Sequence, residues 1–569
     1  MVNPDLKFSQ YPYERPDAKE LGLRFKELIH SFNEAPNAQE QSEAMEAVNR
    51  LRIEFETQAQ LVEIRHSVDT ADAFYKSEQD YMDEIKPIIQ EYVTDYYRAL
   101  VQSRFRRELE ARFGSQLFRL AESALDTFKP EIIEDLQKEN KLVSAYAQLI
   151  ASAKIPFEGE ERTLPQLIPF EQSTDRDTRR RAAESRYAFM AEHEEELDRV
   201  FDELVKVRTR IARTLGFDNF VALGYARMNR TDYNEEMVSR FRQEVLAHIV
   251  PAATRMKERQ RIRIGVDRLE YYDENYKFRS GNPTPKGDPD WIVANGADMY
   301  REMSPETDEF FRFMTERGLM DLVSKPGKQG GGYCTYLPAY EAPFIFSNFN
   351  GTAGDIDVLT HEVGHAFQAY ESRHLRIPEY FFPTAEACEI HSMSMEFFAW
   401  PWMERFFKED ADKYRFNHLS SALLGVPYIA AVDEFQHEVY ANPDATPAER
   451  KRMWRNIERT YLPHRHYEGN DFLERGGFWQ RQLHIYHYPF YYIDYALAQL
   501  CAFDYWNRMN GNAEEAWASY LRLCRAGGSR SFLELVEYAG LLSPFEPGGV
   551  ASTVKGIEAW LDGVDDTKL

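Results

Sequence analysis

The sequence predicts a mainly α-helical protein of at least two lobes that carries one small β-sheet. Three observations predict this fold class. Apolar residues recur every three to four positions through residues 16–150 and again through 175–214, which is the helical period. Strand-like composition is confined to residues 327–350. At 569 residues the chain is also too long for one compact core.

The helical pattern is strongest in the first part of the chain. Residues 43–65 and 78–112 look like long antiparallel helices, because charged and apolar positions alternate at helical spacing with few glycines. Residues 153–174 contain three prolines and are the best connector. Helical periodicity resumes after this connector. Residues 281–289 are rich in proline and glycine, and they predict a surface loop.

Two short strands are expected in the middle of the chain. They fall within residues 327–336 and 344–350 and are separated by Pro338 and Pro343. The glycines of the first segment are not followed by Lys-Ser or Lys-Thr, so they do not form a phosphate-binding loop. An edge strand here can pair with an extended peptide through main-chain hydrogen bonds.

Directly after these strands stands His361-Glu362-Val363-Gly364-His365. Residues four apart share one face of a helix, so His361 and His365 can bind one metal ion together. Glu362 lies about 100° around the helix and can reach a water at the metal without being a ligand. A zinc ion lowers the pKa of such a water toward about 7, and the carboxylate can take its proton. The motif predicts a metallopeptidase.

The residues around the motif fit a buried helix. Thr352 or Asp355 can cap its N-terminus. The apolar positions are Ile356, Val358, Leu359, Val363, Ala366 and Phe367.

Two histidines need a third protein ligand, which we expect on a second helix. Glu371 lies on the same helix as the histidines and cannot close a tetrahedron with them. A new helix starts after Thr384, and Glu389 lies on one face of it together with Glu396. Glu389 is the predicted ligand, and Glu386, about 60° off that face, is its rival. For Glu396, a solvated acid and a residue that orients a ligand remain open alternatives.

These motifs together resemble the zinc oligopeptidases of the thimet oligopeptidase and oligoendopeptidase F superfamily, most closely the bacterial Pz-peptidases. The resemblance spans residues of about 170 to 545. It implies an N-terminal helical lobe over residues 1–170, a catalytic zinc-peptidase region over 171–569 and a deep central channel with one catalytic zinc ion. The matching segments are Arg230 to Tyr233, Gly331 to Thr335, Gly351 to Asp355, the zinc motif, Glu389 with Glu396, and Ala526 to Ser529.

The family also carries a histidine and two tyrosines that bind the peptide and stabilise the transition state. By resemblance these are His484, Tyr488 and Tyr495, since the two tyrosines stand seven apart and would share a helical face. Two features depart from the family. The interval from histidine to tyrosine is one residue short of the thimet-type pattern, and Pro489 can interrupt the helix. A Tyr-rich packing helix is the alternative, and Tyr491 and Tyr492 are the next candidates.

Composition restricts the partners. The net charge of −25 argues against nucleic acid, whose phosphates would be repelled. Four scattered cysteines predict a reducing compartment without disulfides. Residues 1–7 lack an apolar signal segment, and the strongest apolar run, at 423–432, is too short to span a bilayer. We therefore expect a cytoplasmic enzyme without membrane partners. It acts on oligopeptides, and a monomer is the favoured oligomeric state.

Three other functions fit the sequence less well. A zinc aminopeptidase would need an acidic site for the free amine of its substrate, and no motif for one is present. A non-catalytic peptide-binding protein is disfavoured because every ligand type and the base are intact. A structural zinc site is disfavoured because three protein ligands leave the fourth position open.

Overall fold

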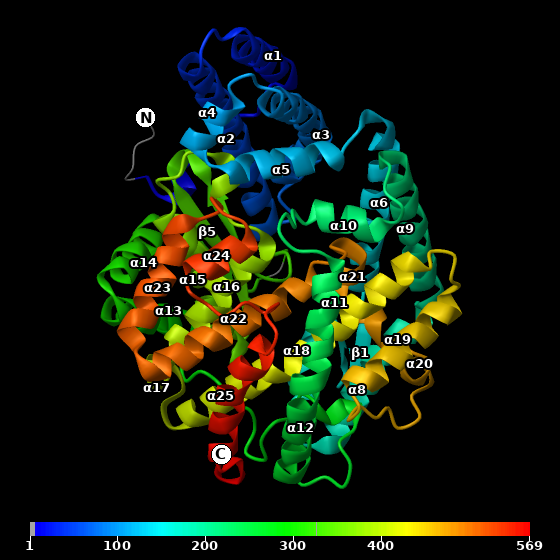
Figure 1. Ribbon diagram of the computed structural model, residues 1–569. Coiled ribbons are helices and arrows are strands. Elements are labelled where there is room, and N and C mark those ends of the chain that lie inside the picture. Colours follow the sequence, from blue (N-terminus) through cyan, green and yellow to red (C-terminus); the bar gives the residue numbers. More distant parts are fainter. Residues whose placement is uncertain (1–5, 326) are drawn as a thin grey trace. The chain divides into compact units, whose positions relative to one another are not determined.

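The computed structural model of the protein describes residues 6–325 and 327–569, with backbone alone at 144, 147, 148 and 151. Residues 1–5, part of the N-terminal stretch without a signal segment, lie outside it. Helices dominate the described chain, and its strands belong to two small sheets (Figure 1). The predicted mainly helical class is therefore confirmed. All four cysteines are free. No helix in the described part of the chain is long and apolar enough to cross a bilayer.

The chain folds into two compact units, each assembled from three segments. Unit 1 takes the chain up to Asp126 together with Thr284–Glu409 and Arg508–Leu541. Its helices are α1 (Ala18–Glu34), α2 (Ala38–Val68), α3 (Ala73–Val101), α4 (Arg106–Phe113), α5 (Ser115–Asp126), α13 (Pro289–Met303), α14 (Pro305–Arg317), α15 (Gly354–Glu371), α16 (Ala385–Phe398), α17 (Met403–Phe407), α23 (Ala513–Ala526) and α24 (Phe532–Tyr538).

Unit 2 takes Thr127–Pro283, Asp410–Asn507 and Leu542–Leu569. Its two-stranded sheet joins β1 (Ile155–Phe157) to β2 (Glu160–Arg162). Its helices are α6 (Ile133–Ala151), α7 (Ile168–Glu171), α8 (Arg176–Glu192), α9 (Glu194–Leu215), α10 (Phe220–Arg227), α11 (Glu235–Glu244), α12 (Val250–Ile264), α18 (Ala411–Ala441), α19 (Pro447–Tyr461), α20 (Asp471–Glu474), α21 (Leu483–His487), α22 (Tyr492–Gly511, which ends in unit 1) and α25 (Gly549–Gly563).

Most predicted helices are present, but two of them are divided. Residues 43–65 lie inside α2, whereas 78–112 are shared between α3 and α4. The division has a local cause: the hydroxyl of Ser103 accepts the backbone N–H of Phe105, which favours a turn over continued helix. Residues 175–214 likewise form α8 and α9, which meet at His193.

The sheet of unit 1 has the strand order β3-β5-β4. The predicted strands correspond to β4 (Tyr333–Leu337) and β5 (Ala342–Phe349), and the sequence analysis missed β3 (Met320–Val323). β5 runs parallel to β3 and antiparallel to β4, so β4 is an edge strand. Pro343 lies inside β5 rather than before it, at a position that pairs with β4 and lies beyond the pairing with β3.

Helices cover both faces of this sheet. The Tyr333 hydroxyl lies 2.6 Å from Ser67 Oγ, and Thr335 Oγ1 donates to Gln60 Oε1 at 2.6 Å, so these side chains of β4 face α2. Cys334 lies between them in the strand. Burial raises the pKa of its thiol, and the charge of Glu362 on α15 raises it further. Because successive side chains of a strand point to opposite faces, α2 covers one face and α15 the other. Helices α15, α16 and α23 lie side by side in unit 1 (Figure 1).

Candidate metal centre

The first two predicted ligands lie on α15, whose apolar side packs against β5. Ile356, Leu359 and Val363 are fully buried, as the sequence predicted. The prediction of the cap is wrong, because α15 begins after Ala353 without a side-chain cap. The Asp355 carboxylate instead accepts the backbone N–H groups of Asn350 and Gly351, each at 2.8 Å. It therefore holds the turn that joins β5 to α15.

Gly364, between the two histidines, lets α16 approach α15 closely. A Cβ atom at this position would lie 2.6 Å from His391 O and 2.6 Å from Ser392 Cα, both on the backbone of α16. Real Cβ atoms do not come this close, so the crossing requires glycine. The close crossing brings Glu389, one turn before Ser392, to the two histidines.

The three predicted ligands converge at this crossing. Glu389 Oε2 lies 3.2 Å from His361 Nε2 and 3.5 Å from His365 Nε2. Zinc bonds of about 2.0–2.1 Å in a tetrahedron separate neighbouring ligand atoms by about 3.3 Å. The two separations match this edge length, so the donor set fits one zinc ion. In the described chain, no other three His, Cys, Asp or Glu residues bring their ligand atoms within 4.8 Å of one another. Glu386 does not belong to this group.

Further contacts orient the ligands. Glu396 Oε1 lies 2.7 Å from His361 Nδ1, which leaves His361 Nε2 facing Glu389. Ser392 Oγ donates to Glu389 Oε2 at 2.8 Å. Against the effect of burial, Glu389 and Glu396 hold the pKa of His361 well above its usual value. Burial likewise disfavours the charged form of Glu389, but the two histidines hold the pKa of its carboxyl well below its usual range.

Glu362 is buried close to the two histidines and Glu389, whose charges act on its carboxyl group. The chain leading into β4 passes over it, since a Cβ on Gly332 would lie 3.5 Å from Glu362 Oε1. Burial raises the pKa of the Glu362 carboxyl, while His361 and His365 oppose the shift. A carboxylate with a raised pKa beside a metal site is suited to take up and release a proton.

The glycines at 527 and 528 support the start of α16. They follow the end of α23. Gly528 N–H donates to Tyr380 O at 2.9 Å, and a Cβ on Gly528 would lie 2.4 Å from Phe382 O. Side chains here would push away the segment that leads into Glu389.

The predicted substrate residues His484, Tyr488 and Tyr495 belong to unit 2. Tyr495 contacts the His484 ring edge-on at 5.8 Å between centroids, and Tyr492 lies nearer, at 4.8 Å. Tyr491 stacks on His484 at 5.7 Å. Tyr488 is 60% exposed and contacts Tyr491 at 6.3 Å. The alternatives Tyr491 and Tyr492 therefore surround His484 together with Tyr495, and Tyr488 lies at the margin.

The prediction that Tyr488 and Tyr495 share one helical face is wrong. Helix α21 ends at His487 and α22 starts at Tyr492, so the interruption anticipated at Pro489 is present. Phe490 takes a positive φ of 69° and is held on both sides. Its N–H donates to Gln436 Oε1 at 2.9 Å, and its carbonyl accepts from Arg230 Nη2 at 2.5 Å. Arg230, from one of the recognised motifs, thus fixes the break between the two tyrosines.

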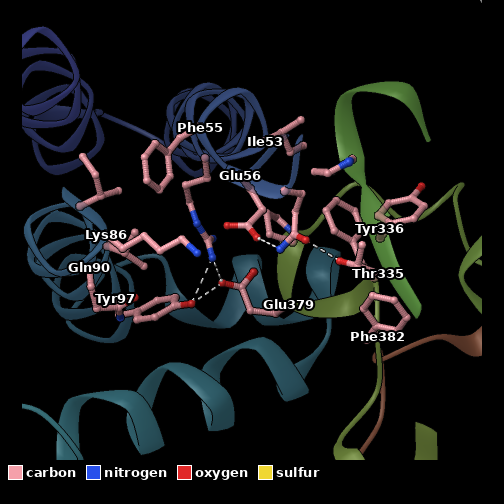
Figure 2. A pocket seen from close by; sticks show the side chains of 17 residues that line it. Ile53, Phe55, Glu56, Lys86, Gln90, Tyr97, Thr335, Tyr336, Glu379 and Phe382 are labelled. Carbon is pink, nitrogen blue, oxygen red and sulfur yellow. Dashed lines mark hydrogen bonds and ion pairs between the residues drawn. The ribbon is translucent and has the colours of Figure 1, made fainter. Parts of the chain in front are cut away.

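Unit 1 also has a cavity of about 670 Å³ between α2, α3 and β4 (Figure 2). Its wall contains Thr335 and Tyr336 of the edge strand. On the opposite side, the carboxylate of Glu379 accepts from Arg52 at 2.6 Å and from the Tyr97 hydroxyl at 2.5 Å. Burial alone would raise the pKa of the Glu379 carboxyl, but the Arg52 guanidinium outweighs burial and holds this pKa below its usual value. No chemical motif in the sequence marks this cavity, because its lining comes from several distant segments.

Comparisons with known proteins agree with this site. Residues 8–128 match the family described as Peptidase M3 N-terminal domain, and residues 170–282 and 305–552 match Peptidase family M3. The chain is similar to a solved structure of Pz peptidase A with an inhibitor, with 64% identity, 99% of this chain and 100% of that chain covered, and a TM-score of 0.96. No curated protein matched the chain.

Two further solved structures extend the comparison. A crystal structure from Bacillus anthracis, described as an oligoendopeptidase F, is 59% identical, with 99% of each chain covered and a TM-score of 0.92. An oligoendopeptidase-F from Enterococcus faecium shares the fold at 15% identity and a TM-score of 0.65, with 97% of this chain and 98% of that chain covered.

A helix with two histidines and a glutamate, crossed by a helix that brings a second glutamate, defines a metallopeptidase. The chain belongs to peptidase family M3, close to Pz-peptidase and oligoendopeptidase F. The predicted family and the predicted class of enzyme are both confirmed.

Proposed function

We propose that the protein hydrolyses internal bonds of short, unstructured peptides and holds one zinc ion with His361, His365 and Glu389. The observation that carries the proposal is the pair of separations, 3.2 and 3.5 Å, between Glu389 Oε2 and the two Nε2 atoms. A bound zinc ion would supply a Lewis acid and lower the pKa of water to about 7.

The remaining chemistry falls to side chains of this chain. Glu362 takes the proton of the attacking water and then gives it to the leaving amine. Glu396 keeps His361 in the orientation that presents Nε2 to Glu389. His484 and the tyrosines around it, with Tyr488 and Tyr495 as first candidates, bind the peptide and stabilise the developing oxyanion.

The substrate is a peptide in extended conformation. β4 is an edge strand, so its outer main-chain groups are available to pair with a peptide backbone without strong sequence preference. The cavity of unit 1 borders the same strand at Thr335 and Tyr336 and can take a side chain of the peptide (Figure 2). The cytoplasmic location and the monomeric state expected from the sequence stay predictions.

The test uses Glu362→Gln, which preserves shape but removes the base. We expect the variant to retain zinc and to bind peptides, while turnover of a peptide library, mapped by mass spectrometry, falls at least about 100-fold. Chelation of the parent enzyme should abolish cleavage and leave the helical circular dichroism spectrum intact. A Glu362→Gln enzyme with parental turnover, or full activity after metal removal, would refute the proposed mechanism.

A further inference from the structure

Unit 2 contains a second cavity, of about 240 Å³, between α8, α18 and the residues that precede α21. It has room for the end of a peptide rather than for a long segment. Most of its polar lining is made of cationic side chains and phenols, which include Lys277, Arg465, Arg481, Tyr187 and Tyr428.

The charges of this cavity are unevenly paired. Glu171 is bound by Arg186 at 2.5 Å, and Glu274 is bound by Arg465 at 2.9 Å, so both acids of the lining are neutralised. Lys277 and Arg481 have no carboxylate within 4.0 Å in the described chain. Within the described chain neither cation therefore forms an ion pair, and the charges of Glu171 and Glu274 act on Arg481 and Lys277 from a greater distance.

The surroundings of both cations favour an anion. Arg481 Nη1 donates to the Tyr187 hydroxyl at 2.9 Å, which orients its guanidinium group without supplying an opposite charge. Burial and the neighbouring ammonium group of Lys257 hold the pKa of Lys277 well below its usual value. An anion in the cavity would stabilise the charged form of Lys277. Because the whole chain carries a net charge of −25, local cations are needed to attract an anionic group.

A chain of contacts joins this cavity to His484. Tyr428 on its wall donates to Gln482 Oε1 at 2.9 Å, and Gln482 Nε2 lies 2.8 Å from His484 Nδ1. Tyr428 also contacts Tyr492, which lies against the His484 ring. Two side chains, Tyr428 and Gln482, therefore connect the wall of the cavity to His484.

We propose that Arg481 and Lys277 bind the C-terminal carboxylate of the peptide substrate in this cavity. The inference rests on the proposed peptidase function and deepens it. An anchor for the chain end favours substrates whose C-terminal carboxylate is free.

The test compares three versions of one short peptide: the free acid, the C-terminal amide, and an amide that ends in glutamate. Cleavage by the zinc-loaded enzyme is followed by mass spectrometry, and binding is measured by calorimetry with zinc-loaded Glu362→Gln protein. We expect the free acid to exceed both amides in kcat/KM and affinity by at least about tenfold, since charge-assisted hydrogen bonds are lost in the amides.

Variants assign this preference to the two cations. Arg481→Gln should raise KM for the free acid about tenfold, leave kcat within about twofold, and remove the difference between acid and amide. Lys277→Gln should act in the same direction, and Arg481→Lys should restore part of the preference. Arg452→Gln, an exposed arginine that pairs with Glu449 at 3.8 Å, is the matched control and should behave as the parent.

Each outcome has a definite meaning. Equal treatment of acid and amide by the parent enzyme, or an Arg481→Gln variant that weakens both alike, overturns the carboxylate site while the peptidase function stands. A glutamate-ended amide as good as the free acid assigns the cavity to a side-chain carboxylate and overturns the C-terminal assignment. A binding preference without any cleavage by the parent enzyme supports the site and refutes the proposed function.

Discussion

Replacement of Gly364 by alanine should damage the metal site without touching any ligand. The new Cβ atom would lie 2.6 Å from two backbone atoms of α16, whereas ordinary contacts begin at 3.4 Å. The helices must therefore separate by about 0.8 Å, which is well beyond the 0.2 Å or so that zinc-ligand distances tolerate. Because Glu389 lies on α16 and both histidines lie on α15, the donor set opens.

We expect Gly364→Ala to lower zinc affinity at least about tenfold and to destabilise the fold by about 1–3 kcal/mol, the usual cost of overpacking. Zinc titration against a competing chelator and thermal unfolding measure the two effects. Gly296→Ala in α13 is the matched control, since its Cβ would meet Phe311 and Leu359 at 3.5 and 3.6 Å. The control should bind zinc normally and gain up to about 1 kcal/mol. Parental zinc affinity in Gly364→Ala would refute the reasoning.

Five other substitutions test the remaining assignments. Glu389→Gln should weaken zinc binding sharply while Glu386→Gln leaves it near normal, and zinc titration with the opposite ranking would move the ligand to Glu386. Glu396→Gln should lower zinc affinity about 10- to 100-fold, because the carboxylate that orients His361 is lost; unchanged affinity would make the contact structural only. Tyr495→Phe should lower kcat more than it raises KM, with Tyr488→Phe as a weaker case because Tyr488 is 60% exposed; parental kinetics in either variant would identify that phenol as packing.

The candidate metal centre could be predicted from the sequence because the positions of its residues depend on spacing within two short segments. Helical spacing places His361 and His365 on one face and Glu389 on one face of a second helix. The close crossing of these helices requires a glycine at position 364, which is one of the positions that the zinc motif leaves unspecified. The role of Glu396 stayed one of two alternatives, because its contact with His361 depends on the rotation of two helices about their axes.

The substrate residues of unit 2 were harder to predict, because spacing alone assumes a continuous helix. Pro489 indicated that the helix is interrupted here. The direction in which Tyr488 points, however, depends on Phe490 and on distant partners. Arg230 and Gln436 lie more than fifty residues away and hold the backbone of Phe490. Long-range hydrogen bonds of this kind leave no local pattern. The missed strand β3 has the same cause, since its four residues gain their strand character from pairing with β5.

The N-terminal helices carry no chemical motif, yet they help to position the third predicted metal ligand. Tyr380 lies in their hydrophobic core, where its hydroxyl donates to Phe113 O at 2.8 Å and accepts from Leu117 N–H at 3.0 Å. The carbonyl of the same residue accepts from Gly528 at 2.9 Å. Tyr380 stands five residues before α16, so the segment that leads to Glu389 is fixed from both sides. The geometry of the metal site therefore depends on three distant parts of the chain, because a ligand set accurate to a few tenths of an ångström needs a rigid support.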